Sequence, residues 1–115
     1  MEEVRRWNSR VRRRGGFRGR ILVRVEGRGW ERSFLVELEG WKIKGLREAR
    51  EGERAEISFS FPLRLMKGRK DEEELVWMII KREVKVKGKF RGMARNLSLW
   101  ASLLPFLASL ARKVG

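Results

Sequence analysis

The chain has 115 residues, enough for one domain with a two-layer core but for little more. Its 29 lysines and arginines outnumber its 15 acids and give a formal net charge of +14, which attracts polyanions such as nucleic acid or an anionic membrane surface. Cysteine and histidine are absent, which excludes disulfides and thiol or zinc chemistry.

The first segment, residues 1–16, is either a short helix or a basic arm. Val4, Trp7 and Val11 are spaced like the apolar stripe of a helix, with acids before them and arginines after them. Three apolar anchors bury little area, so the spacing leaves the basic arm open as an alternative.

Four stretches then alternate apolar and polar residues with a period of two. They predict strands over residues 17–26, 34–39, 41–44 and 54–61. Each stretch is apolar on one face only, so we expect a partly antiparallel sheet with one covered and one solvated face. The polar faces carry arginines, then glutamates, then lysines, a pattern typical of a cross-strand charge ladder.

A helical link is predicted over residues 62–83, because Pro62 suits a first helical turn and acids from Asp71 to Glu74 suit a helix N-terminus. Its length would allow a crossover to a non-adjacent or parallel strand. A fifth strand over 84–91 follows, with its cations pointing outward.

The last helix is predicted over residues 96–112, and no charge occurs between Arg95 and Arg112. Its few polar or helix-breaking positions, Ser98, Ser102, Pro105 and Ser109, form one narrow stripe. The pattern favours a buried core helix and a ligand- or membrane-contacting helix equally. A transmembrane span would need about 20 apolar residues without such an interruption.

The order of these pieces resembles the sterol carrier protein 2 (SCP2-like) family. The stretches that carry the resemblance are AEISFSFPLRLMKG, EELVWMIIKREVKVKG and the apolar run to Leu110, within residues 17–111. The family usually has longer helices before its first strand, so we expect a thinner helical layer here. A PilZ domain is disfavoured, because its D/N-x-S-x-x-G element is missing where the chain reads VELEGWKIKG.

The resemblance implies an α+β fold for a single domain over residues 17–115. We expect a five-stranded, largely antiparallel sheet, helices over one face, and an apolar cavity between the layers. The implied function is non-catalytic binding or transfer of a lipid or other long apolar ligand, with electrostatic docking to anionic membranes. No catalytic residue, cofactor or metal site is predicted, since no nucleophile–base pair is apparent.

The predicted site residues fall into two groups. Those expected to line the apolar site are Phe34, Val36, Phe59, Phe61, Leu75, Ile79, Trp100, Leu103, Leu104 and Leu107. Those expected to contact a membrane or another polyanion are Arg12, Arg13, Arg14, Lys85, Lys87 and Lys89.

Two other functions stay open from the sequence. The same cations of the N-terminal arm and of strand 84–91 could bind nucleic acid without sequence preference. Alternatively, the apolar last helix could be buried in a dimer of an interaction module. No apolar signal segment follows the N-terminus, so we expect a cytoplasmic protein, peripheral to the membrane at most. The charge-rich composition, which lacks Cys, Gln and Thr, is typical of thermophilic proteins.

Overall fold

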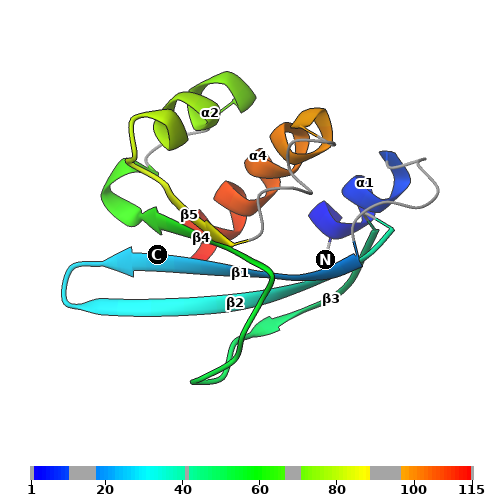
Figure 1. The fold of residues 1–115 in the computed structure, drawn as a ribbon, viewed down its shortest axis with the longest axis horizontal. Helices are drawn as coiled ribbons and strands as arrows, with labels where there is room; N and C mark the ends of the chain where they lie inside the picture. The colour runs from blue at the N-terminus through cyan, green and yellow to red at the C-terminus, as the bar shows by residue number, and fades with distance from the viewer. Residues whose placement is uncertain (1, 11–17, 41, 67–70, 89–96, 115) are drawn as a thin grey trace.

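The computed structural model describes residues 2–10, 18–40, 42–66, 71–88 and 97–114. In chain order these form α1 (Glu2–Arg10), β1 (Arg18–Gly27), β2 (Trp30–Glu39), β3 (Lys42–Glu48), β4 (Ile57–Pro62), the 3₁₀ turn η1 (Leu63–Leu65), α2 (Glu72–Ile80), β5 (Lys85–Gly88) and α4 (Leu97–Val114). The three α-helices lie on one face of a single sheet (Figure 1), which confirms the predicted α+β class.

The sheet has five strands in the order β3-β2-β1-β4-β5. Strands β1, β2 and β3 form an antiparallel meander, and β5 pairs antiparallel with β4. Only β1 and β4 run parallel among these pairs. The acidic strand β2 therefore lies between two basic strands, as the charge pattern predicted, and Arg24 of β1 forms a 2.9 Å ion pair with Glu31 of β2.

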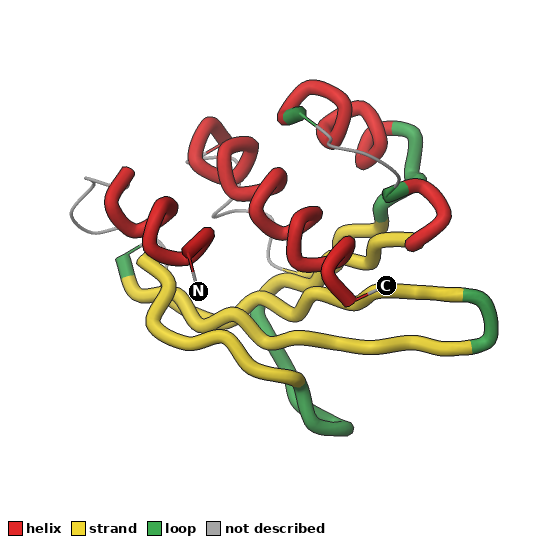
Figure 2. Tube along the Cα trace, turned by 180° about the vertical axis from the view of Figure 1, so that it is seen from behind, coloured by secondary structure: helices red, strands yellow, loops and turns green. Residues whose placement is uncertain are grey.

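The predicted role of the link 62–83 is wrong. It joins β4 to its adjacent antiparallel neighbour β5 and contains two short helices, η1 and α2. Asp71 caps α2 by accepting a 2.8 Å hydrogen bond from the Glu74 N–H. Instead, the link 49–56 leads to the strand that is parallel to β1, namely β4. This link leaves the edge strand β3 and crosses the sheet on the face opposite the helices (Figures 1 and 2).

The N-terminal segment includes the helix α1, which contacts β3 and α4. Trp7 is buried in the core, as its place in the apolar stripe predicted. Asn8 ties the helix to the edge strand, because its side-chain amide donates to the Ile43 carbonyl (3.1 Å) and accepts from the Ile43 N–H (2.7 Å).

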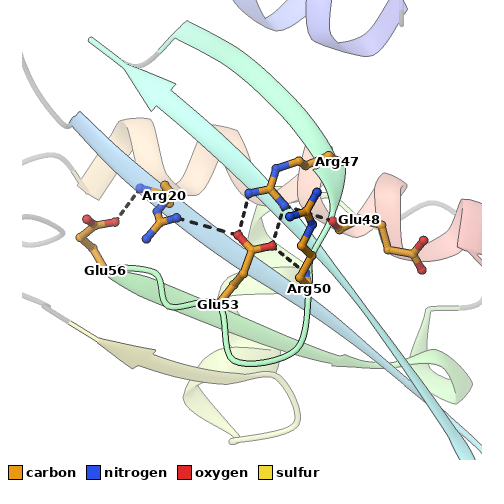
Figure 3. A network of polar contacts seen from close by, with 6 residues as sticks. All are labelled: Arg20, Arg47, Glu48, Arg50, Glu53 and Glu56. Carbon is orange, nitrogen blue, oxygen red and sulfur yellow. Dashed lines mark hydrogen bonds and ion pairs between the residues drawn. The ribbon is translucent and has the colours of Figure 1, made fainter.

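The alternation predicted that the face of the sheet opposite the helices is solvated, but part of this face is covered. Leu35 is fully buried there, outside the main core, with Leu22 and Arg47 as its cross-strand neighbours. Arg47 donates two 2.6 Å hydrogen bonds to the carboxylate of Glu53 in the link 49–56 (Figure 3). The link is thereby fastened across this face of the sheet.

Glu53 is the centre of this network. The Arg50 N–H also donates to its carboxylate at 2.6 Å, and the Arg20 guanidinium lies 3.9 Å away (Figure 3). The Arg47 hydrogen bonds, followed by the Arg50 N–H, lower the pKa of Glu53 from 4.5 to about 2. Protonation therefore costs this carboxylate more in the folded than in the unfolded chain.

This pKa shift predicts a pH-dependent contribution to stability. Because the folded pKa is depressed, the contribution of Glu53 is complete above its unfolded value of 4.5 and is lost as the pH falls towards 2. Urea unfolding should show Glu53→Gln to be less stable than the native chain at pH 6, with the difference shrinking by pH 2. Glu51→Gln, at an exposed position of the same link, is the control and should behave like the native chain at both pH values. An equal deficit of Glu53→Gln at both pH values would contradict the prediction.

Candidate ligand-binding site

The layer between the sheet and the helices contains nearly all the predicted apolar site residues. Seven of them are buried in one core cluster: Val36, Phe59, Phe61, Leu75, Leu103, Leu104 and Leu107. Phe34 and Ile79 are partly buried against this cluster. The side chain of Trp100 lies outside the described part of the chain. The structure thus brings the predicted residues together from β2, β4, α2 and α4.

Close packing is the main property of this layer. The rings of Phe59 and Phe61 are stacked, with their centroids 6.2 Å apart. Both rings are fully buried, as are the side chains of Leu75, Leu103 and Leu107. The residues that were predicted to line a cavity therefore contact one another, and the cavity between the layers stays a prediction.

Helix α4 packs in the core from Leu103 to Ala111. Leu103, Phe106 and Leu110 are buried, whereas Ser102, Pro105 and Ser109 of the predicted polar stripe are only half-buried. The stripe thus faces away from the centre of the core, as its periodicity indicated. Among the described helices, none combines the length and the apolar character that crossing a bilayer would require.

A groove open to solvent lies beside this core, at the end of the sheet where β1 turns into β2. Its volume is about 1230 Å³, and three separate segments line it: the β1–β2 turn, the end of β4 with η1, and the turn from α2 into β5. These segments lie at the same end of the molecule (Figures 1 and 2). The lining residues are Glu26, Gly27, Arg28, Ser60, Pro62, Leu63, Arg64, Leu65, Met66, Arg82, Glu83 and Lys85.

Sequence periodicity did not predict this groove, although Lys85 of its lining was expected to contact a polyanion. Arg28, Arg64 and Arg82 each lie in or beside a turn, and the segments that carry them are far apart along the chain. The parallel β1–β4 pairing and the β4–β5 pairing bring these segments to one end of the sheet. A cation next to a turn was the available signal, but periodicity does not detect it.

The predicted polyanion contacts are only partly described. Lys85 and Lys87 are exposed on β5, on the outward side that the alternation predicted. Arg12, Arg13, Arg14 and Lys89 lie outside the described residues. Base stacking by Phe59 or Phe61 is excluded by their burial, so these aromatic residues do not support the nucleic-acid alternative.

Helix α2 exposes two large apolar side chains. Trp77 is 53% and Ile80 61% exposed. Leu75 and Met78 face the core instead. Trp77 and Lys81 line a second groove, which shares Leu65 and Glu83 with the larger one. An apolar edge therefore lies directly beside the basic groove.

Solved structures of other proteins have a similar architecture. No protein-family model matches the sequence, and no curated protein is significantly similar to it. A crystal structure of sterol carrier protein 2 matches 96% of this chain and 90% of its own, with a TM-score of 0.65 and 15% identity. A conserved hypothetical protein from Thermus thermophilus matches 99% of this chain and 78% of its own, with a TM-score of 0.58 and 15% identity.

A third match is the palmitated sterol carrier protein 2-like 2 from Aedes aegypti. It covers 90% of this chain and 93% of its own length, with a TM-score of 0.56 and 13% identity. The fold thus recurs in several proteins of very different sequence. This chain has the fold of sterol carrier protein 2.

Proposed function

We propose that this protein binds a lipid or another long apolar ligand without catalysing a reaction on it. The observation that carries the proposal is the fold, which is shared over 90% of the chain with a sterol carrier protein studied in its palmitated form. The composition of the layer supports it, since the described residues of this layer are almost all apolar. An acyl chain would gain about 25 cal/mol for each Å² of apolar surface that it buries there.

Helix α2 is more easily displaced than α4 to admit such a ligand. Its nine residues include only two buried side chains, Leu75 and Met78, whereas the described part of α4 contributes seven to the core. Burial of a large apolar side chain contributes about 1.5–3 kcal/mol, so α2 is held by far less apolar contact than α4. We therefore place the ligand between α2, α4 and the strands β1 and β4.

Uptake of a fluorescent fatty acid by the full chain tests this proposal. We expect saturable binding of one ligand, with a matching mass shift in native mass spectrometry. Ile79→Asp should weaken binding more than tenfold, because it places a carboxylate against the apolar layer. Ile80→Asp, the same change at the exposed neighbouring position, should bind like the native chain. Absence of ligand uptake in both measurements would overturn the proposal.

Transient docking on anionic membranes is the second part of the proposed function. It is supported by the net charge of +14 and by the exposed cations Lys85 and Lys87. The exposed edge of α2 adds an interfacial anchor, since a tryptophan ring suits the boundary between headgroups and acyl chains. Each nearby cation adds about 1 kcal/mol of attraction to an anionic surface.

Vesicle sedimentation measures this docking. Trp77→Ala should weaken partition onto phosphatidylglycerol-containing vesicles about tenfold, the effect of losing roughly 50 Å² or more of inserted apolar surface. Native protein should bind pure phosphatidylcholine vesicles much less, and salt should reduce its binding to the anionic ones. Equal binding to both kinds of vesicle would contradict electrostatic docking. Preferential binding of DNA or RNA would favour the nucleic-acid alternative.

A further inference from the structure

The groove at the β1–β2 turn combines cations with an apolar floor. We propose that it binds the anionic head of a single-chain amphiphile, a carboxylate or a phosphate, while the tail extends towards the core. This inference rests on the proposed function and names the chemical class of the ligand. The four cations that line the groove, Arg28, Arg64, Arg82 and Lys85, come from three separate segments of the chain.

These cations differ from the other arginines of the sheet in having no described partner. Arg20, Arg24, Arg32 and Arg47 all form ion pairs with glutamates of the sheet or of the link 49–56. Within the part of the chain that the structure describes, the side chains lining the groove form no ion pair or hydrogen bond. Their charge is therefore available to an incoming anion.

The groove also contains two acids, Glu26 and Glu83. Four cations and two acids leave an excess of positive charge, which selects an anionic head over a neutral one. Arginine binds carboxylate and phosphate oxygens through paired N–H groups, so several arginines can hold one head.

The apolar floor gives the site a direction. Pro62 and Met66 line the groove, and Met66 is itself buried in the core cluster. Leu63 and Leu65, also in the lining, pack against that cluster. A ligand whose head lies among the cations therefore meets apolar side chains that lead into the layer between sheet and helices. An anion without an apolar tail would make no contact with these apolar side chains.

The backbone conformation of Arg82 is a second, independent observation that supports an anion site in this groove. It has a φ of 63°, the left-handed conformation in which glycine is usual. The Arg82 N–H donates to the Ile79 carbonyl and the Glu83 N–H to the Met78 carbonyl, which is the hydrogen-bond pattern that ends a helix at such a residue. An arginine at this position costs stability, and it is one of the residues that line the groove.

Isothermal titration calorimetry of the full chain tests the site with four probes: dodecyl phosphate, dodecanoate, dodecanol and inorganic phosphate, the amphiphiles below their micellar concentrations. We expect dodecyl phosphate and dodecanoate to bind more tightly than dodecanol, and inorganic phosphate to bind much more weakly than dodecyl phosphate. Removal of Arg28, Arg64 and Lys85 together, each replaced by Gln, should weaken dodecyl phosphate binding about a hundredfold and dodecanol binding little.

Arg82→Gly makes a sharper test, because its two effects have opposite directions. The melting temperature should rise by about 4 °C or more as the backbone strain is relieved. Dodecyl phosphate should nevertheless bind about fivefold more weakly. Arg54→Gln removes an exposed cation of the link 49–56 that does not line the groove, and it should change neither binding nor selectivity. A purely structural role for Arg82 would leave dodecyl phosphate affinity unchanged or improved.

The outcomes separate this proposal from the function on which it rests. Equal affinity for dodecanol and dodecyl phosphate, unchanged in the variants, would overturn the groove and leave apolar binding intact. Inorganic phosphate binding as tightly as dodecyl phosphate would show a free-anion site and overturn the amphiphile. If none of the three amphiphiles bound, the proposed function itself would fail.

Discussion

Replacing Phe59 by alanine is expected to lower the free energy of unfolding by about 3–5 kcal/mol, the usual cost of deleting a buried phenylalanine ring. Phe59 is fully buried on β4 and stacks on Phe61, so core side chains would border the space that it leaves. Urea unfolding of the purified variant measures the loss. The value depends on how tightly the layer between sheet and helices is packed.

The neighbouring residue supplies the control for this prediction. Ser58 lies on the opposite face of β4, and Ser58→Ala should change stability by no more than about 0.5 kcal/mol. A loss below about 1 kcal/mol for Phe59→Ala would mean that the ring borders an open space instead of a packed core. That result would contradict the packing described above and would favour a preformed ligand cavity.

Gly88→Ala is expected to cost about 3 kcal/mol of stability, because strain and steric overlap act together. Gly88 ends β5 with a φ of 132°, a conformation that residues with a Cβ rarely adopt. A Cβ at this position would overlap the Glu56 carbonyl oxygen and lie 2.8 Å from the Ile57 Cα. Since both neighbours are backbone atoms, β5 would have to move away from β4.

Comparison with Gly52→Ala separates the steric part of this effect from the backbone strain. Gly52 also has a positive φ, of 82°, but nothing lies within 4 Å of its added Cβ. It should therefore lose only about 1 kcal/mol. Thermal or urea unfolding of the two variants gives the difference, and equal losses would contradict the overlap at β5.

Much of the fold follows from local patterns in the chain. Alternation of period two identified all five strands of the sheet. The meander charges were also interpreted correctly, since glutamates of β2 lie between arginines and lysines. These features depend on residues that are near one another in sequence, and periodicity reports them directly.

Pairing between distant strands was not predictable in the same way. A period of two shows which side chains share a face but not which strand lies next to which, so the parallel β1–β4 pair and the crossing of link 49–56 were missed. The exposure of Trp77 and Ile80 could not be predicted, because every residue of α2 from Leu75 to Ile80 is apolar and the pattern does not show which side is buried. The groove was missed because its cations belong to three distant segments.

The contact between Asn8 and Ile43 has a consequence for how this sheet meets other chains. An unpaired edge strand offers its N–H and carbonyl groups as a template for a strand of another molecule. Asn8 occupies both backbone groups of Ile43 on β3, and the opposite edge, β5, is only four residues long and carries two exposed lysines. Short, lysine-bearing or covered edges resist aggregation. The protein thus protects both edges of its sheet, β3 with the amide of Asn8 and β5 with two lysines.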